Sequence, residues 1–368
     1  MIYVDNAATT NLDEDAFELM KEYLTINYGN ASQLYDFGRK SRIALNEARE
    51  KIAKCIGADP EEVYFTSCGT ESDNWAIKMG SQNMDQIIVS VIEHHAVLNS
   101  CKAVEASGKK AKYLPVNDKG EVCIEDLDEL LGDRRSLVSV MYANNEIGTI
   151  EPIKVLAEIT HRHGGIFHTD AVQAIGHIPV DVHDLDVDML SASGHKFNAP
   201  KGIGFLYIKK GMEIKSFLDG GAQEKGYRAG TENIAAIVAM ACALEKNCSR
   251  MIENEKHLRL LEDIVITKLQ NSGLDFMRNG SDNHVPGSLN LSFADAEGEM
   301  ILHRLDLKKI CISIGSACDS KNTQISHVIR AIGVPARYAE GTIRISFGKN
   351  NTESEAEEIA EALIDVLK

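Results

Sequence analysis

The sequence predicts an α/β protein, with a large domain built on a mainly parallel sheet and a smaller α+β domain. Through much of the 368-residue chain, short segments rich in valine and isoleucine alternate with segments of helical spacing. Beyond the long helical segment 233–269, this alternation gives way to separate strand-like segments. Strands that alternate with helices favour a parallel sheet covered on both faces, which accounts for the large domain.

The expected elements of the large domain follow one another regularly. Helical spacing is present in segments 13–24, 38–57, 69–83, 94–108 and 152–164. Short apolar segments predict strands at 62–67, 86–93, 137–143, 165–171, 188–193 and 202–210. Each expected strand is short enough to be covered by the helices beside it, as in an open α/β sheet.

The C-terminal part of the chain has a different pattern. Strand-like segments at 287–293, 309–315 and 341–348 are interrupted by helices. Thr352 and Glu355 form a capping box before a final amphipathic helix. We expect the domain border inside the long helical segment, near residue 255. The large domain is then 13–255, and 1–12 with 256–368 forms the small domain.

Composition excludes several classes of protein. The chain is 44% hydrophobic and 26% charged, which is typical of a globular protein, and its net charge of -16 offers no basic surface for nucleic acid or anionic lipid. The first residues do not have the pattern of a signal peptide, and no apolar stretch is long enough to cross a bilayer. None of the eight cysteines forms a CxxC pair, so we expect no metal centre and no disulfide framework. A reducing, cytoplasmic location fits this cysteine usage.

Polar residues follow several expected strands, where an open α/β sheet binds its ligands. Gly69 and Thr70 open a helix whose free N–H groups suit a phosphate, although Thr70 could also be a simple cap. Asp170 ends a very apolar strand and is either a helix cap or the partner of a protonated ring nitrogen. His94, also at a strand end, is either a structural residue or a group that stacks on a planar cofactor.

Lys196 lies in the stretch SGHKFNAP, between two apolar segments. A buried lysine loses its proton more easily and becomes nucleophilic. A Schiff-base lysine, an aspartate for a pyridinium nitrogen and a phosphate-binding helix end together meet the needs of pyridoxal 5'-phosphate. Ser193 and His195 add donors for the phosphate. The order of these residues on an α/β pattern therefore predicts this cofactor.

Cys318 has an unusual setting for a cysteine. It lies in segment 312–322, among glycine, serine, alanine and aspartate. An inert thiol in a loop is one interpretation. A mobile and exposed cysteine also suits a nucleophile, which is the second interpretation.

Taken as a set, several motifs resemble those of the cysteine desulfurases, pyridoxal-phosphate enzymes of the class V aminotransferase group. The motifs, which together cover nearly the whole chain, are YVDNAATT, ESDNWAIKMG, NNEIGTI, HTDAVQAIG, SGHKFNAPKGIG, GTEN, GSAC and IRISFGKNNTESE. SGHK with GSAC is similar to the subgroup whose active cysteine lies on a longer, flexible loop. The resemblance implies fold type I of the pyridoxal-phosphate-dependent transferases.

The resemblance also implies roles for the residues around the cofactor ring. Lys196 would form the Schiff base, Asp170 would pair with the ring nitrogen, and His94 would stack on the ring and assist proton transfer. Asn145 and Gln173 would contact the oxygen side of the ring.

The resemblance implies two further groups of site residues. The phosphate would be held by Gly69, Thr70, Ser193 and His195, together with Thr231 from the neighbouring subunit of a homodimer. The carboxylate of the substrate L-cysteine would be held by Arg344 and Asn30.

The implied reaction converts L-cysteine to L-alanine and leaves a persulfide on Cys318. The persulfide would pass to a sulfur-acceptor protein, either an iron–sulfur scaffold or a thiolation enzyme. A selenocysteine lyase, another class V lyase or aminotransferase, and a non-catalytic pyridoxal-phosphate-binding or scaffolding protein are the alternatives. The chain departs from the family pattern at Ala31, Tyr35, Cys68, Gly69 and Ile314.

Overall fold

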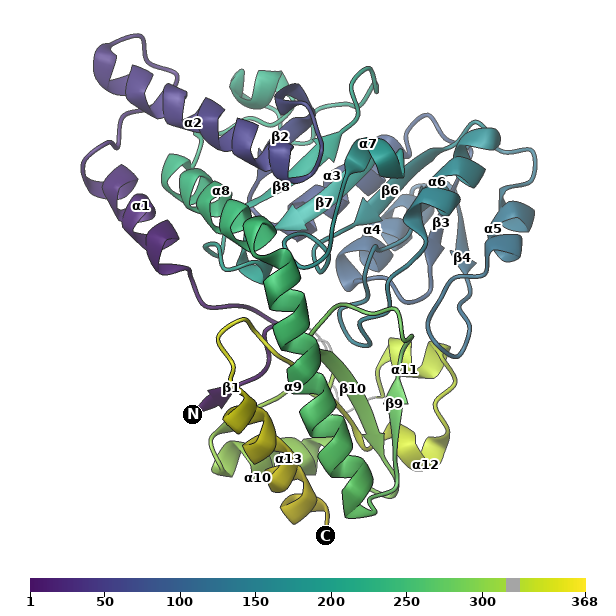
Figure 1. Cartoon of the computed structure of the whole chain (residues 1–368). Helices are drawn as coiled ribbons and strands as arrows, with labels where there is room; N and C mark the ends of the chain where they lie inside the picture. The colour runs from purple at the N-terminus through teal and green to yellow at the C-terminus, as the bar shows by residue number, and fades with distance from the viewer. Residues whose placement is uncertain (316–324) are drawn as a thin grey trace.

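The structure is a computed structural model that describes residues 1–315 and 325–368. Its main sheet has the strand order β2-β8-β7-β6-β5-β3-β4 (Figure 1). These strands are β2 (Val63–Thr66), β8 (Gly204–Ile208), β7 (Met189–Ser193), β6 (Ile166–Asp170), β5 (Ser136–Ser139), β3 (Gln86–Ser90) and β4 (Lys110–Leu114). The five strands from β7 to β4 pair in parallel, and β8 runs antiparallel to both of its neighbours. The predicted α/β class with a mainly parallel sheet is therefore confirmed.

Helices cover both faces of this sheet. The helices of this part are α1 (Glu14–Thr25), α2 (Asp36–Cys55), α3 (Gly69–Gly80), α4 (His95–Ala106), α5 (Ile124–Leu131), α6 (Ile153–Arg162), α7 (Val182–Leu185) and α8 (Ile234–Ser249). Alternate residues of β3 belong to different apolar cores: Ile87 and Val89 pack with Trp75 of α3, whereas Ile88 packs in the core of the opposite face. Burial of both faces explains why the central strands are apolar at nearly every position.

A second group of elements lies below the main sheet in Figure 1. Its strands are β9 (Phe276–Asn279), β10 (Ser288–Phe293) and β12 (Thr342–Ser346) in one antiparallel sheet, with β1 (Ile2–Tyr3) and β11 (Ile310–Cys311) paired in parallel. Its helices are α9 (Met251–Ser272), α10 (Gly298–Leu307), α11 (His327–Ala331), α12 (Ala336–Ala339) and α13 (Glu353–Leu367). Ile2 and Val4 pack with Leu258 and later residues in an apolar core of their own. The exact border near residue 255, inside α9, stays a prediction.

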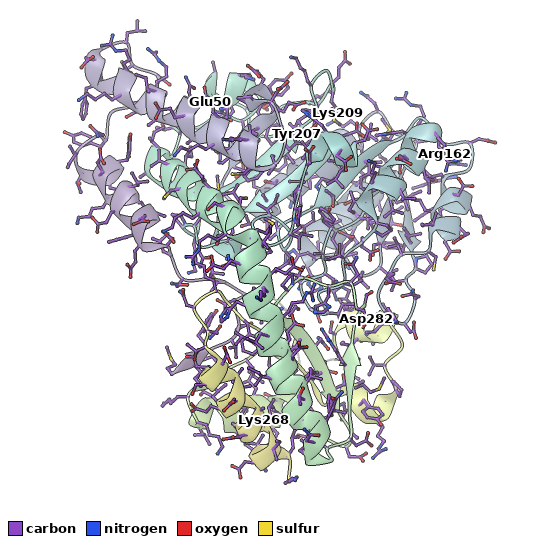
Figure 2. All side chains as sticks on the ribbon, in the orientation of Figure 1. Glu50, Arg162, Tyr207, Lys209, Lys268 and Asp282 are labelled. Atoms are coloured by element: carbon purple, nitrogen blue, oxygen red, sulfur yellow. The ribbon has the colours of Figure 1, made fainter. Side chains whose placement is uncertain are left out.

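The N-terminal segment connects this second core with the main sheet. Ile2 pairs with Ile310, and a few residues later the Thr10 hydroxyl donates to the main-chain oxygen of His195, at 2.8 Å. Three short 3-10 helices complete the described part of the chain: Pro60–Glu62, Gln223–Gly226 and Gly194–Lys196, the last directly after β7. In Figure 2, Tyr207 of β8 lies within the packed layers, whereas Glu50 and Arg162 lie on helices at the outside.

Three features differ from the sequence-based expectations. The long helical segment is interrupted at Arg250, which separates α8 from α9. The strand expected at 309–315 is shortened to β11, which pairs with β1. Strands β1, β4 and β9 and helices α5 and α7 were not predicted from the sequence. Strand β1 has two residues, and β4, at the sheet edge, contains two lysines and is partly exposed. The capping box of Thr352 and Glu355 is confirmed.

Among the described residues, no helix combines the length and apolar character that spanning a membrane requires.

Candidate active site

A cavity of about 220 Å³ opens at the carboxyl ends of β3, β5, β6 and β7. This is the edge at which an open α/β sheet binds its ligands. Ten of the predicted site residues line the cavity, namely Gly69, Thr70, His94, Asn145, Asp170, Gln173, Ser193, His195, Lys196 and Arg344. These residues come from six separate stretches of the sequence, and the fold brings them around one space.

Lys196 lies at the end of the short helix that follows β7. Its Nζ donates hydrogen bonds to the main-chain oxygens of Ala7 and Ala8, at 2.6 and 2.9 Å. The main-chain oxygen of Lys196 contacts Nε2 of the half-buried His177, at 2.9 Å. These hydrogen bonds fix both the main chain and the amine of Lys196, so the amine has a defined position in the wall of the cavity.

Asp170 is the last residue of β6 and is only 4% exposed. Its Oδ1 accepts a hydrogen bond from the Val172 amide, at 2.9 Å. Burial raises the pKa of Asp170 to about 6, against the lowering effects of the Val172 amide and of Lys196. The carboxylate is therefore ionised at neutral pH, where it can pair with a cationic ring nitrogen.

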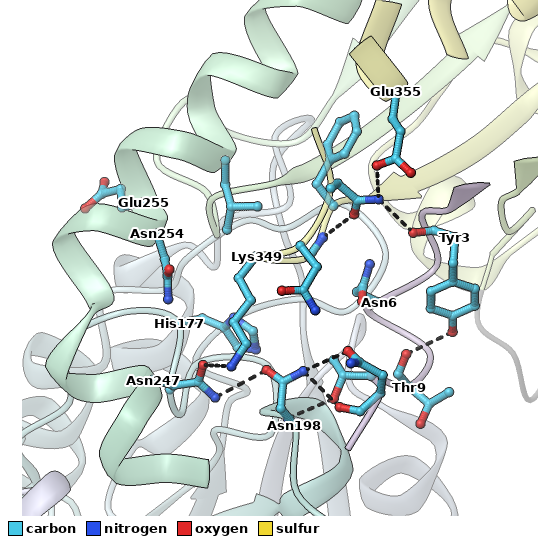
Figure 3. A pocket seen from close by; sticks show the side chains of 18 of the residues that line it. Tyr3, Asn6, Thr9, His177, Asn198, Asn247, Asn254, Glu255, Lys349 and Glu355 are labelled. Atoms are coloured by element: carbon cyan, nitrogen blue, oxygen red, sulfur yellow. Dashed lines mark hydrogen bonds between the residues drawn. The ribbon is translucent and has the colours of Figure 1, made fainter. Parts of the chain in front are cut away.

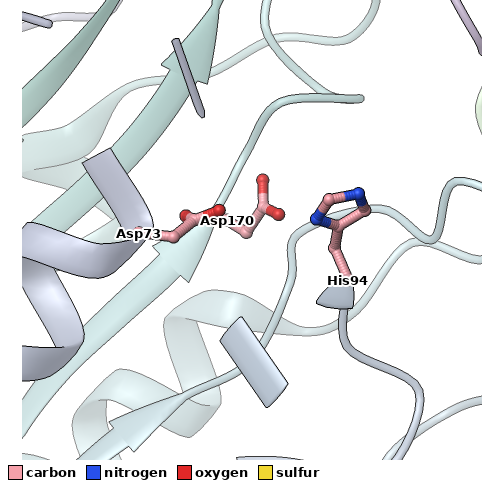
Figure 4. A group of neighbouring side chains, drawn as sticks. All are labelled: Asp73, His94 and Asp170. Atoms are coloured by element: carbon pink, nitrogen blue, oxygen red, sulfur yellow. The ribbon is translucent and has the colours of Figure 1, made fainter. Parts of the chain in front are cut away.

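His94 is the N-cap residue of α4, and its Nδ1 accepts a hydrogen bond from the Ala96 amide, at 3.1 Å. A neutral ring that accepts at Nδ1 carries its proton on Nε2, so the cap fixes both the tautomer and the ring orientation. Figure 4 shows the Asp170 carboxylate between His94 and Asp73. One polar atom from each of these three side chains lies within 4.8 Å of the others.

The amino end of α3 has the features of a phosphate site. Its N-cap residue, Cys68, makes no side-chain capping hydrogen bond. A Cβ atom on Gly69 would lie 2.8 Å from a methyl group of Val172, so only glycine fits without a shift. The Ser193 hydroxyl is buried and has no hydrogen-bond partner among the described residues. Free helix N–H groups beside an unpartnered hydroxyl fit a phosphate group.

His195 stands beside this site as a neutral side chain. Its Nδ1 lies 3.2 Å from the Thr9 hydroxyl. Burial, together with the nearby Lys196 and Lys201, lowers the pKa of His195 to about 4. At neutral pH the ring therefore offers one N–H donor and one acceptor.

Arg344 lies on β12 of the small sheet, lines the cavity and is 1% exposed. Its Nη1 donates to the main-chain oxygen of Asn145, and its Nη2 donates to Oδ1 of Asp5, both at 2.7 Å. Its Nε has no partner among the described residues. A buried guanidinium with spare donor capacity suits a carboxylate ligand.

Three predicted residues are not part of this arrangement. Thr231 and Asn30 are exposed and do not line the cavity. The Asn30 side chain instead accepts a hydrogen bond from the Ser32 amide, at 2.9 Å. Cys318 lies outside the described residues, so its predicted exposure and mobility stay predictions.

Several residues of the site were missed in the sequence. Ala7 and Ala8 contribute main-chain oxygens, and Asp5 contributes the partner of Arg344. No side-chain pattern marks a main-chain acceptor, so Ala7 and Ala8 could not have been found. Asp73 could have been found, because it follows Gly69 by one helical turn and therefore lies on the same face of α3.

A second cavity, of about 510 Å³, lies beside the N-terminal segment (Figure 3). It is lined by Tyr3, Asn6, His177, Asn198 and Lys349, among others. Its lining includes Asn6 and Thr9, which flank the Ala7 and Ala8 of the first cavity in the sequence, but none of the residues predicted for the cofactor.

Known proteins resemble this chain over its full length. The family model for aminotransferase class V matches residues 2–359. The cysteine desulfurase IscS of Methanosarcina thermophila is 44% identical over 371 residues, which cover 100% of this chain and 92% of that protein. The cysteine desulfurase IscS of Dictyoglomus turgidum is 46% identical, with 100% of this chain and 95% of that protein covered.

Solved structures agree with these sequence relatives. A NifS-like protein superposes with a TM-score of 0.94 at 37% identity, covering 100% of this chain and 99% of that chain. SspA, solved in complex with cysteine, superposes with a TM-score of 0.84 at 32% identity, covering 96% of this chain and 100% of that chain. The chain therefore belongs to the class V aminotransferase family, within the group of the cysteine desulfurases.

Proposed function

We propose that this protein is a pyridoxal-phosphate-dependent cysteine desulfurase that transfers the sulfur of L-cysteine to Cys318. The observation that carries the proposal is the single cavity in which Lys196, Asp170 and the amino end of α3 meet. Relatives named as cysteine desulfurases, at more than 40% identity over the whole chain, support the reaction type.

The residues of the cavity fit pyridoxal 5'-phosphate. Lys196 would hold the aldehyde through a Schiff base, Asp170 the ring nitrogen, and Ser193 with the amino end of α3 the phosphate. When bound, this cofactor withdraws electrons from the bonds of the substrate α-carbon. Two structural features match the phosphate: the Ser193 hydroxyl, which has no partner among the described residues, and Gly69 at the start of α3, where Val172 leaves no room for a Cβ atom.

The chain's own groups then account for binding and proton movement. Arg344 would hold the substrate carboxylate through its spare N–H donors. The amine of Lys196 would accept the proton of the substrate α-carbon. Asp170, ionised at neutral pH, would keep the ring nitrogen protonated.

The sulfur step involves Cys318. Its thiolate attacks the sulfur of the substrate, and an S–S bond forms while the bond between that sulfur and the β-carbon breaks. The electron pair stays with the β-carbon, which takes up a proton. The products are L-alanine and one persulfide on Cys318, so no external oxidant or reductant is needed.

The test is an assay for L-alanine from L-cysteine, run beside L-selenocysteine, with mass spectrometry of the Cys318 peptide. We expect one alanine per turnover and one extra sulfur on that peptide. C318S should bind L-cysteine but form little alanine, whereas C311S, which alters a half-buried thiol of β11, should turn over normally. An extra sulfur on another peptide, or full turnover by C318S, would contradict the sulfur step.

We also propose that the active form is a cytoplasmic homodimer that hands its sulfur to an acceptor protein. Exposed apolar side chains support a dimer, since Phe17, Leu24, Ile26 and Leu34 on and between α1 and α2 are 51%, 57%, 66% and 89% exposed. Thr231 is exposed as well, as a donor to a neighbouring subunit would have to be. Light scattering that finds a fully active monomer at assay concentration would rule out the dimer.

A further inference from the structure

Asp73 is a buried acidic residue with no assigned part in the reaction. It lies on α3 one turn after Gly69, lines the cofactor cavity, and is 1% exposed. Its Oδ1 has no hydrogen-bond partner among the described residues. Burial of a carboxylate with an unpartnered oxygen is costly, and burial of the neutral carboxylic acid costs less free energy because it carries no charge.

His168 of β6, a potential ion-pair partner of Asp73, is neutral. The Nε2 of His168 lies 3.8 Å from Oδ1 of Asp73. The two ring nitrogens of His168 already contact the Ser191 and Ser139 hydroxyls, at 2.9 and 2.8 Å. Burial lowers the pKa of His168 to about 3, so the ring is neutral.

Several titratable groups surround Asp73, and the acidic group Asp170 favours its proton. From the elements packed against it, these groups are Asp170, His168, Glu93, His94, Cys68 and Lys196. Burial and the neighbouring Asp170 raise the pKa of Asp73, and they do so against a smaller lowering effect of Ser191. Burial also raises the pKa of Glu93. Lys196 lowers the pKa of Asp170 instead, so the negative charge of this cluster falls on Asp170.

We propose that Asp73 is a neutral, protonated positioning residue, which leaves Asp170 as the single negative charge presented to the ring nitrogen of the cofactor. The proposal rests on the proposed function, because the ring nitrogen belongs to that cofactor. A second negative charge within 4.8 Å of Asp170 would instead change the electrostatic potential at the ring nitrogen. It would also change the potential at the phosphate site, which lies at the start of the helix that carries Asp73.

The first experiment detects the proton itself, in the full-length protein without added cofactor. Infrared difference spectra between wild type and D73N at neutral pH should show the C=O stretching band of a protonated carboxylic acid, lost in the variant. E151Q is the positive control, because Glu151 is another buried acid, with a pKa raised to about 8 by burial, outside this cavity. No lost band in D73N, beside a lost band in E151Q, would overturn the proposal.

The second experiment measures the dissociation constant of pyridoxal 5'-phosphate by its absorption band. D73N keeps the shape and neutrality of the acid, so we expect a value within about threefold of wild type. D73A removes the support beside Asp170, and we expect binding at least about tenfold weaker. A loss of about tenfold or more in a folded D73N would show that Asp73 is ionised in wild type, and wild-type affinity in D73A would show that it positions nothing.

These outcomes separate the inference from the proposed function. A wild-type protein that stays colourless with added pyridoxal phosphate contradicts the cofactor assignment, while the infrared result still reports whether Asp73 holds a proton. Thermal unfolding of each variant confirms that it is folded before its affinity is compared.

Discussion

The side-chain nitrogen of Lys196 donates a hydrogen bond to the main-chain oxygen of Ala7, 2.6 Å away. Gln173 donates to the same oxygen from its Nε2, at 3.0 Å. The N-terminal segment therefore forms one wall of the cavity, and two residues expected to contact the cofactor are oriented by it. A site that appears in the sequence as a set of strand ends depends equally on a segment without regular structure.

Removal of the Lys196 amine should abolish covalent attachment of the cofactor. We expect wild-type protein to be yellow with pyridoxal phosphate, and K196A to lose that absorption band or to hold the cofactor only non-covalently. Absorption spectra before and after gel filtration measure this. K201A is the matched control, since Lys201 is a nearby exposed lysine outside the cavity, and it should keep the band.

The phosphate site should be sensitive to Ser193 and Gly69. S193A removes one hydroxyl donor, and we expect cofactor binding to weaken by about tenfold, the effect of one hydrogen bond to a charged group. G69A should weaken binding further, because its Cβ would lie 2.8 Å from a Val172 methyl group. Cofactor titration of the apoprotein measures both. S81A, at the other end of α3, should bind as wild type does, and equal losses in S81A and S193A would show a general effect on the helix.

Replacement of Arg344 by lysine should affect the substrate more than the cofactor. Lysine cannot reproduce the forked donors of Arg344, which reach Asp5 and Asn145 and leave Nε without a partner among the described residues. We therefore expect KM for L-cysteine to rise about tenfold or more. Steady-state kinetics measure KM and kcat separately. R278K is the control, because Arg278 of the same small sheet bonds the buried Glu262 away from the cavity and should leave KM unchanged. An unchanged KM in R344K would contradict the substrate role.

Glu151 should make the stability of the protein depend on pH. Burial raises its pKa in the folded protein from 4.5 to about 8, so its contribution is fully present below about pH 4.5 and is lost as pH rises through about 8. In E151Q this loss is absent, and the free energy of unfolding should exceed that of wild type at pH 8 by more than at pH 5, by a few kcal/mol at most. Urea unfolding at both pH values measures the difference. A difference that stays constant with pH would show that Glu151 is ionised throughout.

Local patterns in the sequence predict most of the helices and central strands. The capping box before α13 and the apolar run of β6 need no tertiary information, since hydrogen bonding and burial specify them within a few residues. The strand β1 could not be predicted in the same way, because its two residues form a strand only through β11, far along the chain.

The residues of the candidate site also fall into two groups: those that local sequence patterns predict and those that depend on contacts between distant segments. Lys196, Asp170 and Gly69 follow strands, and the rule that ligands bind at strand ends identifies them. Asp5 and the oxygens of Ala7 and Ala8 have no such mark, because their roles come from the course of the N-terminal segment across the sheet. The roles that the family resemblance implies for Thr231, Asn30 and Cys318 stay predictions.

The pairing of β1 with β11 has a consequence for synthesis on the ribosome. Ile2 emerges before the strands of the main sheet, whereas its partner Ile310 emerges only after them. The main sheet can assemble earlier, because its strands lie between Val63 and Ile208. Closure of so long a loop is slow compared with local folding, so the wall that orients Lys196 forms last. Ribosome-bound chains that end before residue 310 should therefore contain a folded sheet and still be unable to capture the cofactor.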